Sequence, residues 1–270
     1  MDKPKIRDQR LKMAPRDDAR RALAAWFRSA LGEQVFATEQ ALHDELLEDT
    51  VGYHLLQISA QNQALFAKSP IPHKRRLAES FGLDPDLIAS PLQMPILTDQ
   101  VDVVLLHHLL EFVDRPQALL TESARVVMPQ GLLMITGFNP FSFWGMKALL
   151  SRESAAFPFK GRFLSAPKLM DWLNILNFKI DRVLYAEFGL PMLMPWVRPP
   201  NFGLGLGRRY NLMFGGVYMI IARKYVAPLT PVRGFRQRRL IRFSDLGLSD
   251  SVPGGLTPSR TVSLSELRSE

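Results

Sequence analysis

One segment constrains the fold more than any other, because residues 101–136 predict a strand, a helix and a second strand in close succession. Residues 101–106 (VDVVLL) are rich in branched apolar side chains, as in a strand covered on both faces. Asp114 is a good N-cap, and Pro116 follows where proline opens a helix. Residues 132–136 (LLMIT) predict the second strand. The three elements form a βαβ unit, whose strands are parallel and whose crossover is right-handed.

The rest of the chain predicts further strands and helices around this unit. Apolar residues recur at helical spacing over residues 20–49, and Gly32 is expected to divide this stretch into two helices. The later segments predict strands at residues 53–59, 64–67, 87–89, 178–187 and 217–224, and a helix at 166–176. This succession predicts an α/β fold with a mostly parallel sheet.

The composition excludes several kinds of site. The 270 residues include no cysteine, which removes disulfides, thiolate metal ligands and cysteine nucleophiles. The N-terminal residues are charged throughout and lack the apolar stretch of a secretory signal, which favours a cytoplasmic location. No membrane span is predicted, because the longest uncharged run, residues 126–146, is interrupted by two prolines and three glycines.

The positive charge is concentrated at the two ends of the chain. The net charge is +8, and residues 1–21 hold eight basic residues against four acidic ones. Residues 227–270 are rich in Arg, Ser, Gly and Pro, a composition typical of disorder. We therefore expect flexible basic tails at residues 1–20 and 227–270 around one domain at residues 21–226. Two interpretations of the tails stay open: solubilising extensions, or contact with nucleic acid or an anionic membrane.

Residues 101–147 resemble the second half of a class I methyltransferase domain of the methyltransferase type 11 group. In that group a strand is followed by the letters LE, then an Asp-Pro turn, then RVL and a glycine turn, and a similar order occurs here. Residues 137–145 (GFNPFSFWG) are similar more specifically to the YafS-like branch. The resemblance implies a doubly wound, Rossmann-like methyltransferase sheet, mostly parallel with an antiparallel last strand. It also implies S-adenosylmethionine as the cofactor, bound across the carboxyl ends of the parallel strands.

The first-strand motif departs from the family pattern. The family has an acidic residue and three alternating glycines there, which let the backbone approach the cofactor. Gln57 stands in place of the acid, and Ser59, Gln61 and Gln63 replace the glycines. By resemblance, the cofactor is expected beside Gln57, Ser59 and Gln61.

The other cofactor contacts implied by the resemblance follow later strands, and they are Ser90, Pro91, Leu92 and His107. Glu79 is the only acid at the distance from Gln57 where a ribose-binding carboxylate is expected, and it lies in an amphipathic run rather than at a predicted strand end. Residues 57–90 are too few for two helices and two strands of mean length about 11 and 5 residues. The first crossover helix is therefore expected to be missing or reduced to a turn.

The expected acceptor site lies in two loops rich in aromatic and methionine side chains, residues 137–145 and 189–214. The residues expected to line the substrate pocket are His108, Asn139, Ser142, Phe143 and Trp144. Adjacent residues of a strand point to opposite sides, so His107 and His108 are not expected to share a metal ion, and no metal site is predicted. No catalytic acid or base is assigned.

The sequence supports two main hypotheses about function. The first is a methyltransferase acting on an apolar or lipid-like small molecule, with apolar loops that also suit peripheral membrane contact. The second is a catalytically inactive relative that binds or regulates, because the cofactor-binding glycines are lost. A third, an RNA-modifying enzyme, rests on the basic tails alone.

Overall fold

The structure is a computed structural model, and it describes residues 22–61, 63–79, 85–143, 145, 162–187 and 213–225. The expected tails, and almost all of the expected loop at residues 189–214, lie outside these residues. The elements are α2 (Ala30–Glu48), β1 (His54–Ser59), β2 (His73–Ala78), β3 (Leu87–Ile88), β4 (Val101–His107), η2 (Leu110–Phe112), α3 (Pro116–Val126), β5 (Val127–Phe138), α5 (Ala166–Ile175), β6 (Phe178–Ala186) and β7 (Val217–Lys224).

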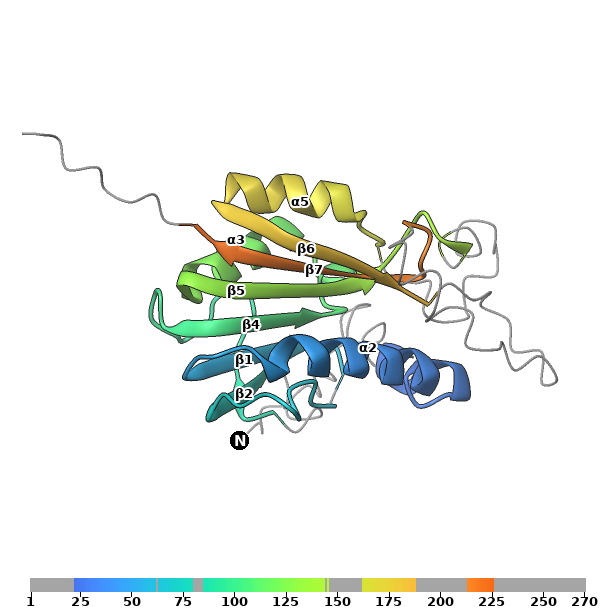
Figure 1. Ribbon diagram of the computed structural model, residues 1–270, viewed down its shortest axis with the longest axis horizontal. Coiled ribbons are helices and arrows are strands. Elements are labelled where there is room, and N and C mark those ends of the chain that lie inside the picture. Colours follow the sequence, from blue (N-terminus) through green and yellow to red (C-terminus); the bar gives the residue numbers. More distant parts are fainter. Residues whose placement is uncertain are drawn as a thin grey trace, which may run out of the picture. The chain divides into compact units, whose positions relative to one another are not determined.

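The described strands form one seven-stranded sheet in the order β3-β2-β1-β4-β5-β7-β6 (Figure 1). Strands β1 to β5 pair in parallel, and β7 pairs antiparallel with both β5 and β6. The predicted α/β fold, its parallel βαβ unit and its antiparallel last strand are therefore confirmed. The strand order reverses between β1 and β4, and ligands of doubly wound sheets bind beyond the carboxyl ends at such a point.

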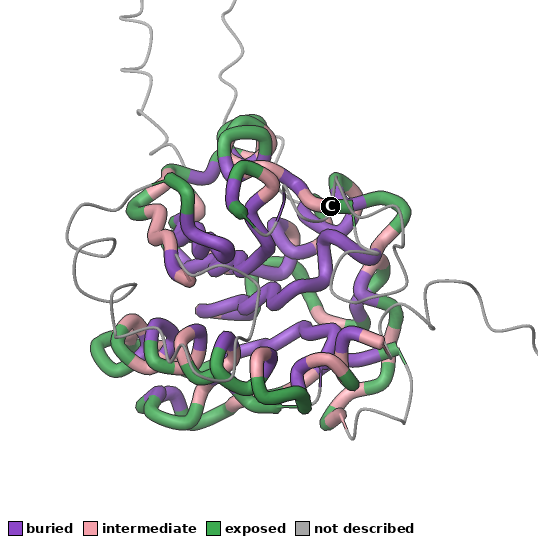
Figure 2. Tube along the Cα trace, turned by 90° about the vertical axis from the view of Figure 1, so that its right-hand side faces the viewer, coloured by how far each residue is buried: buried purple, intermediate pink, exposed green. Residues whose placement is uncertain are grey.

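Helices cover both faces of the sheet, because successive side chains of each strand point to opposite faces. On one face, Val103 and Leu105 of β4 pack with Leu42 and Leu47 of α2. The alternate side chains of β1, β4 and β5 pack on the other face with α3 and α5. Burial is accordingly concentrated in the strands, while exposed residues lie on the outer parts of the described chain (Figure 2).

A separate apolar cluster closes the carboxyl end of the sheet. It joins side chains from the segment before α2, from α2 itself, from η2 and from the ends of β1, β5 and β7 or directly beside them: Leu23, Phe27, Val35, Ala60, Phe112, Phe138 and Val217. This cluster lies where the fold would place its ligands, so it decides which polar groups there remain open to solvent.

The connection between β1 and β2 contains no helix in its described residues, 60–61 and 63–72. The prediction of a reduced first crossover is confirmed. The predicted strand at residues 64–67 is wrong, because this stretch forms bends and turns. The second strand is instead formed by residues 73–78 (HKRRLA). Its three basic side chains hide the apolar pattern of a strand, because only its last two residues are buried.

The predicted division of the first helical stretch is confirmed, but the break lies at residues 27–29 rather than at Gly32. Ser29 caps α2 by accepting from the Gly32 amide at 3.2 Å. The prediction of a second helix end is wrong. Helix α3 has Arg115 rather than Asp114 at its N-cap, and no side chain caps it. Ser29 is a preferred N-cap residue, so α2 follows the capping rule, whereas α3 begins without a side-chain cap.

Gly32 allows the segment before α2 to fold back against the start of that helix. A Cβ atom on Gly32 would lie 2.1 Å from the carbonyl oxygen of Trp26, which is far inside contact distance. We expect Gly32→Ala to lower the free energy of unfolding by about 1–3 kcal/mol, as overpacked sites do. Chemical denaturation measures this, with Glu33→Ala at the exposed neighbouring position as the control. Equal stability of the two variants would contradict the close approach.

Candidate functional site

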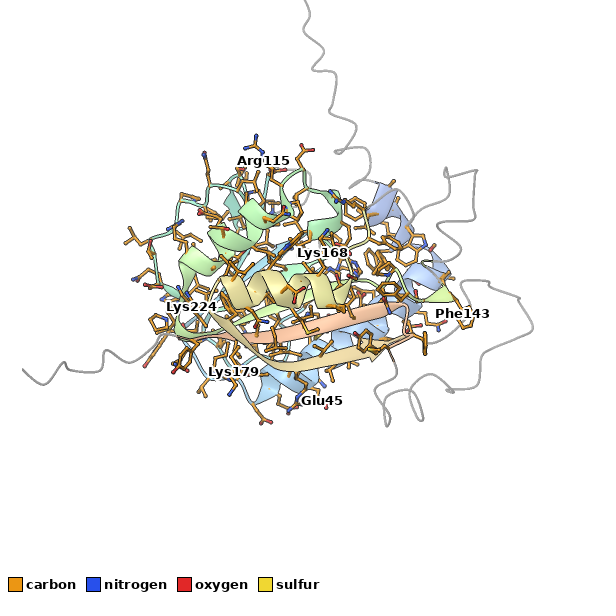
Figure 3. The ribbon with its side chains drawn as sticks, turned by 90° about the horizontal axis from the view of Figure 1, so that it is seen from above. Glu45, Arg115, Phe143, Lys168, Lys179 and Lys224 are labelled. Carbon is orange, nitrogen blue, oxygen red and sulfur yellow. The ribbon has the colours of Figure 1, made fainter. Side chains whose placement is uncertain are left out.

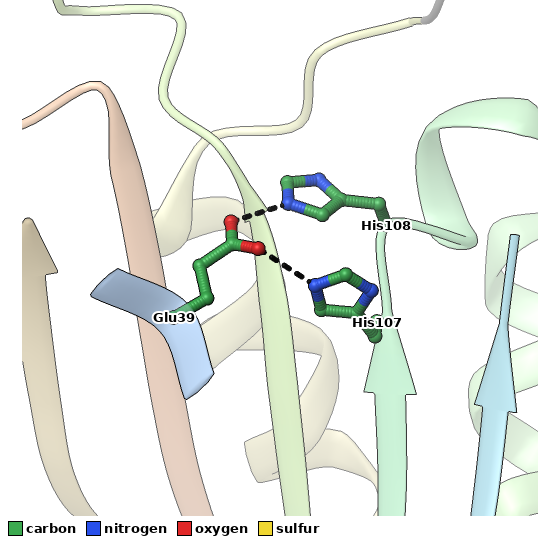
Figure 4. A group of neighbouring side chains, drawn as sticks. All are labelled: Glu39, His107 and His108. Atoms are coloured by element: carbon green, nitrogen blue, oxygen red, sulfur yellow. Dashed lines mark hydrogen bonds and ion pairs between the residues drawn. The ribbon is translucent and has the colours of Figure 1, made fainter. Parts of the chain in front are cut away.

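Two histidines at the carboxyl end of β4 point to one carboxylate. His107 continues the side of β4 that carries Val103 and Leu105, so its imidazole faces helix α2. His108 follows the strand with φ 45°, in the left-handed region, which interrupts the alternation of the strand. Both rings thereby turn toward Glu39 of α2 (Figure 4). The expectation that these neighbours point to different sides is wrong for this physical reason.

The contacts with Glu39 are short and use both oxygens of its carboxylate. His107 Nε2 lies 2.8 Å from Oε2, and His108 Nε2 lies 2.7 Å from Oε1. All three side chains are 0% exposed. A buried carboxylate between two imidazoles forms charge-assisted hydrogen bonds, which are stronger than neutral ones.

The second nitrogen of each imidazole also has a polar neighbour. His107 Nδ1 lies 3.2 Å from Ser59 Oγ, and His108 Nδ1 lies 3.3 Å from Glu111 Oε1. The same Glu111 oxygen accepts from the Phe138 amide at 2.9 Å. The cluster therefore links α2 with the carboxyl ends of β1, β4 and β5.

Burial and charge act in opposite directions on these groups. Burial alone would raise the pKa of Glu39, but the charges and hydrogen bonds of His108 and His107 outweigh it and lower this pKa to about 2. Burial alone would lower the pKa of His108, but Glu39 and Glu111 raise it to about 9. Burial lowers the pKa of His107, and it lowers that of nearby His43 to about 4. The carboxylate and His108 thus form a buried ion pair.

Aromatic side chains separate this cluster from solvent. The Phe27 ring centroid lies 5.7 Å from that of His107 and 5.5 Å from that of His108. The Phe138 ring lies 4.1 Å from His108 on the other side. His107 was expected to contact the cofactor and His108 the substrate. The structure places both in an enclosed polar network, where a substrate would meet neither ring without displacement of Phe27.

Gln57 and Ser59 of β1 and Gln61 just after it line a small cavity. Gln57 holds the following loop, because its Nε2 donates to the Gln63 carbonyl and its Oε1 accepts from the Leu65 amide, both at 2.8 Å. Ser59 accepts from the Gln61 amide. The cavity measures about 10 Å³, and its other walls are Arg76, Leu77, Ala78 and Pro85. This is room for about one water molecule.

One buried donor faces no partner at this place. The amide nitrogen Nε2 of Gln61 has no hydrogen-bond partner among the described residues, although Gln61 is only 5% exposed. Buried donors are almost always paired, so an unpaired one in a cavity wall is a candidate ligand contact. Gln57 and Ser59 are in contrast used within the fold.

Glu79 follows directly after β2, at the carboxyl end of that strand. The prediction that it does not lie at a strand end is therefore wrong. A carboxylate at the end of the second strand is the group that accepts hydrogen bonds from ribose hydroxyls in dinucleotide-binding folds. Ser90, Pro91 and Leu92 form a turn after β3, where Ser90 Oγ accepts from the Leu92 amide, and none of them lines the cavity beside Gln61.

The predicted acceptor residues lie in the loop after β5. Asn139 is buried, and its amide donates to the carbonyls of Met213 and Gly215 at 2.8 Å each. Ser142 is also buried and donates to the Asn139 carbonyl. Phe143 is 48% exposed. Trp144 lies outside the described residues. Asn139 and Ser142 thus shape the loop, and the exposed aromatic rings are the part that can meet a ligand.

Comparisons with known proteins agree with this architecture. A family model described as a methyltransferase domain matches residues 50–135. YafS of Escherichia coli K12, an uncharacterized protein, is 31% identical over 193 residues, which are 71% of this chain and 77% of YafS. This chain belongs to the YafS-like class I methyltransferases. S-adenosylmethionine is the cofactor of this family.

Solved structures show the same fold. A SAM-dependent methyltransferase of Thermotoga maritima matches with a TM-score of 0.56 at 19% identity, over 77% of this chain and 97% of that one. A SAM-dependent methyltransferase of Archaeoglobus fulgidus matches with a TM-score of 0.52 at 15% identity, over 74% of this chain and 96% of that one. In the described part of the chain, no helix combines the length and the apolarity that crossing a bilayer requires.

The residues beside β1 and β2 fit S-adenosylmethionine in their chemistry. Gln61 supplies an unpaired donor for a carboxylate or carbonyl oxygen, and Glu79 supplies an acceptor for ribose hydroxyls. The cavity of about 10 Å³ is far smaller than the 300 Å³ or more of ordinary ligand pockets. The cavity as described therefore has no room for the whole cofactor.

Sequence reasoning missed Glu39 and discounted Glu79. Glu39 lies on the apolar face of the first helix, at a position where a carboxylate is rare unless it is paired, and this was the available signal. For Glu79, three basic residues hid the preceding strand.

Loss of the Glu39 charge should destabilise the fold strongly. We expect Glu39→Gln to lower the free energy of unfolding by about 3–5 kcal/mol, because it removes the charge that contacts buried His108 at 2.7 Å and leaves only Glu111, at 3.3 Å, beside it. Denaturant titration measures this. Glu48→Gln, at the exposed end of the same helix, should change stability by less than about 0.5 kcal/mol. A similar small effect at Glu39 would mean that the ion pair contributes nothing.

Proposed function

We propose that the chain transfers a methyl group from S-adenosylmethionine to an apolar or lipid-like small molecule. The observation that carries the proposal is a set of exposed apolar side chains on two neighbouring loops, here called the apolar loop pair: Phe141, Phe143, Met213 and Phe214. Their exposed fractions are 66%, 48%, 65% and 64%. Exposed apolar groups gathered at one place usually mark an interaction site.

Asn139 holds the two loops of the pair together. Besides the two side-chain bonds to the second loop, its backbone amide donates to the Gly216 carbonyl at 2.9 Å. Its Oδ1 in turn accepts from the Phe141 amide at 3.1 Å. The aromatic side chains are therefore presented from a fixed backbone rather than from independent loops.

The apolar loop pair lies at the end of the sheet where this fold handles ligands. One loop leaves the carboxyl end of β5, and the other enters β7 beside it, because Phe138 pairs with Val217. Phe143 points outward at this end (Figure 3). An acceptor held there would be on the same edge as Gln61 and Glu79, which follow β1 and β2.

The chain's own residues contribute binding and alignment. The cofactor, when bound, supplies a methyl group that its sulfonium has already activated. Gln61 and Glu79 orient it from the ends of β1 and β2, and the apolar loop pair holds the acceptor and excludes water. Alignment of two bound reactants accelerates a reaction without any acid or base. The enclosed histidines accordingly need no part in proton transfer.

A specific observation also supports the alternative, a catalytically inactive relative. Gln57 occupies the position of the family's acidic residue and Ser59 that of its first glycine, and both bond within the fold. The remaining cavity holds about one water molecule. If this cavity cannot widen, the fold retains a methyltransferase sheet without its cofactor.

Calorimetric titration with S-adenosylmethionine and with its demethylated product separates the two functions. We expect binding by the wild type. Glu79→Ala should raise Kd about 10- to 100-fold, because a charge-assisted hydrogen bond to the ligand is worth about 1.5–3 kcal/mol. Glu48→Ala is the control and should leave Kd unchanged. No binding of either compound by the wild type favours the inactive relative, while an unchanged Kd in Glu79→Ala removes Glu79 from the site.

The acceptor class is tested by transfer of a labelled methyl group to fatty acids, isoprenoid alcohols and alkyl phenols. We expect Phe141→Ser with Phe214→Ser to lower kcat/KM by about tenfold or more and to leave cofactor Kd unchanged, because one buried aromatic contact is worth about 1.5–3 kcal/mol. The control replaces Leu97 and Ile175 by serine, since both are equally exposed but lie elsewhere. Equal activity of the two double variants, or transfer only to polar acceptors, would contradict the proposed acceptor.

A further inference from the structure

We infer that Glu39, His107 and His108 form a closed site for one divalent transition-metal ion of the zinc type. The ligand atoms of these three side chains all lie within 4.8 Å of one another. The inference goes beyond methyl transfer and does not depend on it, because it rests on a side-chain cluster on the far side of Ser59 from the Gln61 cavity.

The donor set matches such an ion in number and kind. Each imidazole presents Nε2, and each of these nitrogens faces a different oxygen of the Glu39 carboxylate. Two nitrogens and a bidentate carboxylate give four donors, the coordination number that zinc usually adopts. Ligands at about 2.0–2.1 Å from one tetrahedral ion lie about 3.3 Å apart. The present contacts of 2.7 and 2.8 Å therefore need to open by about half an ångström, and the other ligand atoms, which lie within 4.8 Å of one another, need to draw together around the ion.

The outer contacts orient both imidazoles as metal ligands. A metal-binding histidine usually donates its other N–H to a carboxylate or another acceptor, which fixes the ring and its tautomer. Here His107 Nδ1 faces the hydroxyl of Ser59, and His108 Nδ1 faces the carboxylate of Glu111. Both Nε2 atoms thereby face the Glu39 carboxylate, each toward a different oxygen (Figure 4).

The charge of the cluster also favours a cation. Glu39 and Glu111 are both buried, and no lysine or arginine side chain contacts either carboxylate among the described residues. Glu111 Oε2 has no hydrogen-bond partner in the same part of the chain. Buried charges are ordinarily paired or bound to a metal. His108 supplies one positive charge to these two carboxylates, whereas a divalent ion in place of its proton would balance both.

Enclosure by apolar side chains points to a structural rather than a catalytic ion. Leu23, Phe27 and Val35 belong to the apolar cluster around the site, and all three ligands are fully buried. Catalytic zinc keeps an open position for water or substrate, whereas structural zinc is closed by protein ligands. The ion would tie α2 to the end of β4, 68 residues further along the chain.

The experiment uses tag-free full-length chain, unfolded in denaturant and refolded with zinc sulfate or with EDTA. After desalting we expect about one zinc per chain, and a Tm about 4 °C or more above that of the EDTA-refolded chain, since a ligand that binds only the folded state stabilises it. Refolding with cobalt should give the visible absorption of a four-coordinate ion.

The matched control separates the buried histidines from a surface pair. His54 and His73 are exposed and stack with ring centroids 5.1 Å apart, so they could bind zinc adventitiously. We expect the double variant His54→Asn/His73→Asn to keep the zinc and the cobalt spectrum, and His107→Asn/His108→Asn to lose both. If the second variant fails to fold, the comparison of the first variant with the wild type still shows whether zinc binds away from the surface histidine pair. No retained zinc, no cobalt absorption, or loss of metal in the surface variant would overturn the inference.

Discussion

The buried carboxylate of Glu39 between His107 and His108 is the constraint on which the arrangement of this domain depends. It fastens α2 to the carboxyl end of β4 through contacts of 2.8 and 2.7 Å. A buried charge is costly unless it is paired, so the helix can take only the position that brings the carboxylate to the two imidazoles. The same position places the apolar face of α2 on the sheet and carries Phe27 over the histidines.

The reduced crossover after β1 follows from that arrangement. In the described residues, α2 covers the face of the sheet that helices after β1 and β2 would otherwise share. Without a helix there, the loop after β1 needs another anchor, and the Gln57 side chain provides it with two hydrogen bonds. A glutamine at a position where the family has an acid thus has a structural explanation. Among the described buried side chains at the ends of β1 and β2, only Gln61 keeps an unpaired donor.

The carboxyl end of the sheet is consequently divided into three parts with different chemistry. Beside β1 and β2 lies a small polar cavity with Gln61 in its wall and Glu79 after β2. Beside β4 lies the enclosed cluster of histidines and carboxylates. Beside β5 and β7 lies the apolar loop pair, held by Asn139. The apolar loop pair suits a small methyl acceptor, and the polar cavity beside β1 and β2 suits a cofactor. Neither ligand reaches the enclosed cluster beside β4 without displacing Phe27.

The sequence by itself determined the elements and their class. Patterns local to residues 101–136 and 217–224 predicted β4, α3, β5 and β7, and the motif they carry predicted the family, because periodicity and turn chemistry act over a few residues. The strand at 73–78 was missed, since its outer side chains are basic. Only the tertiary structure decided that His107 and His108 share Glu39, because a left-handed backbone at His108 turns one ring, and the carboxylate comes from 68 residues away. Contacts at such separations leave no periodic signal in the chain.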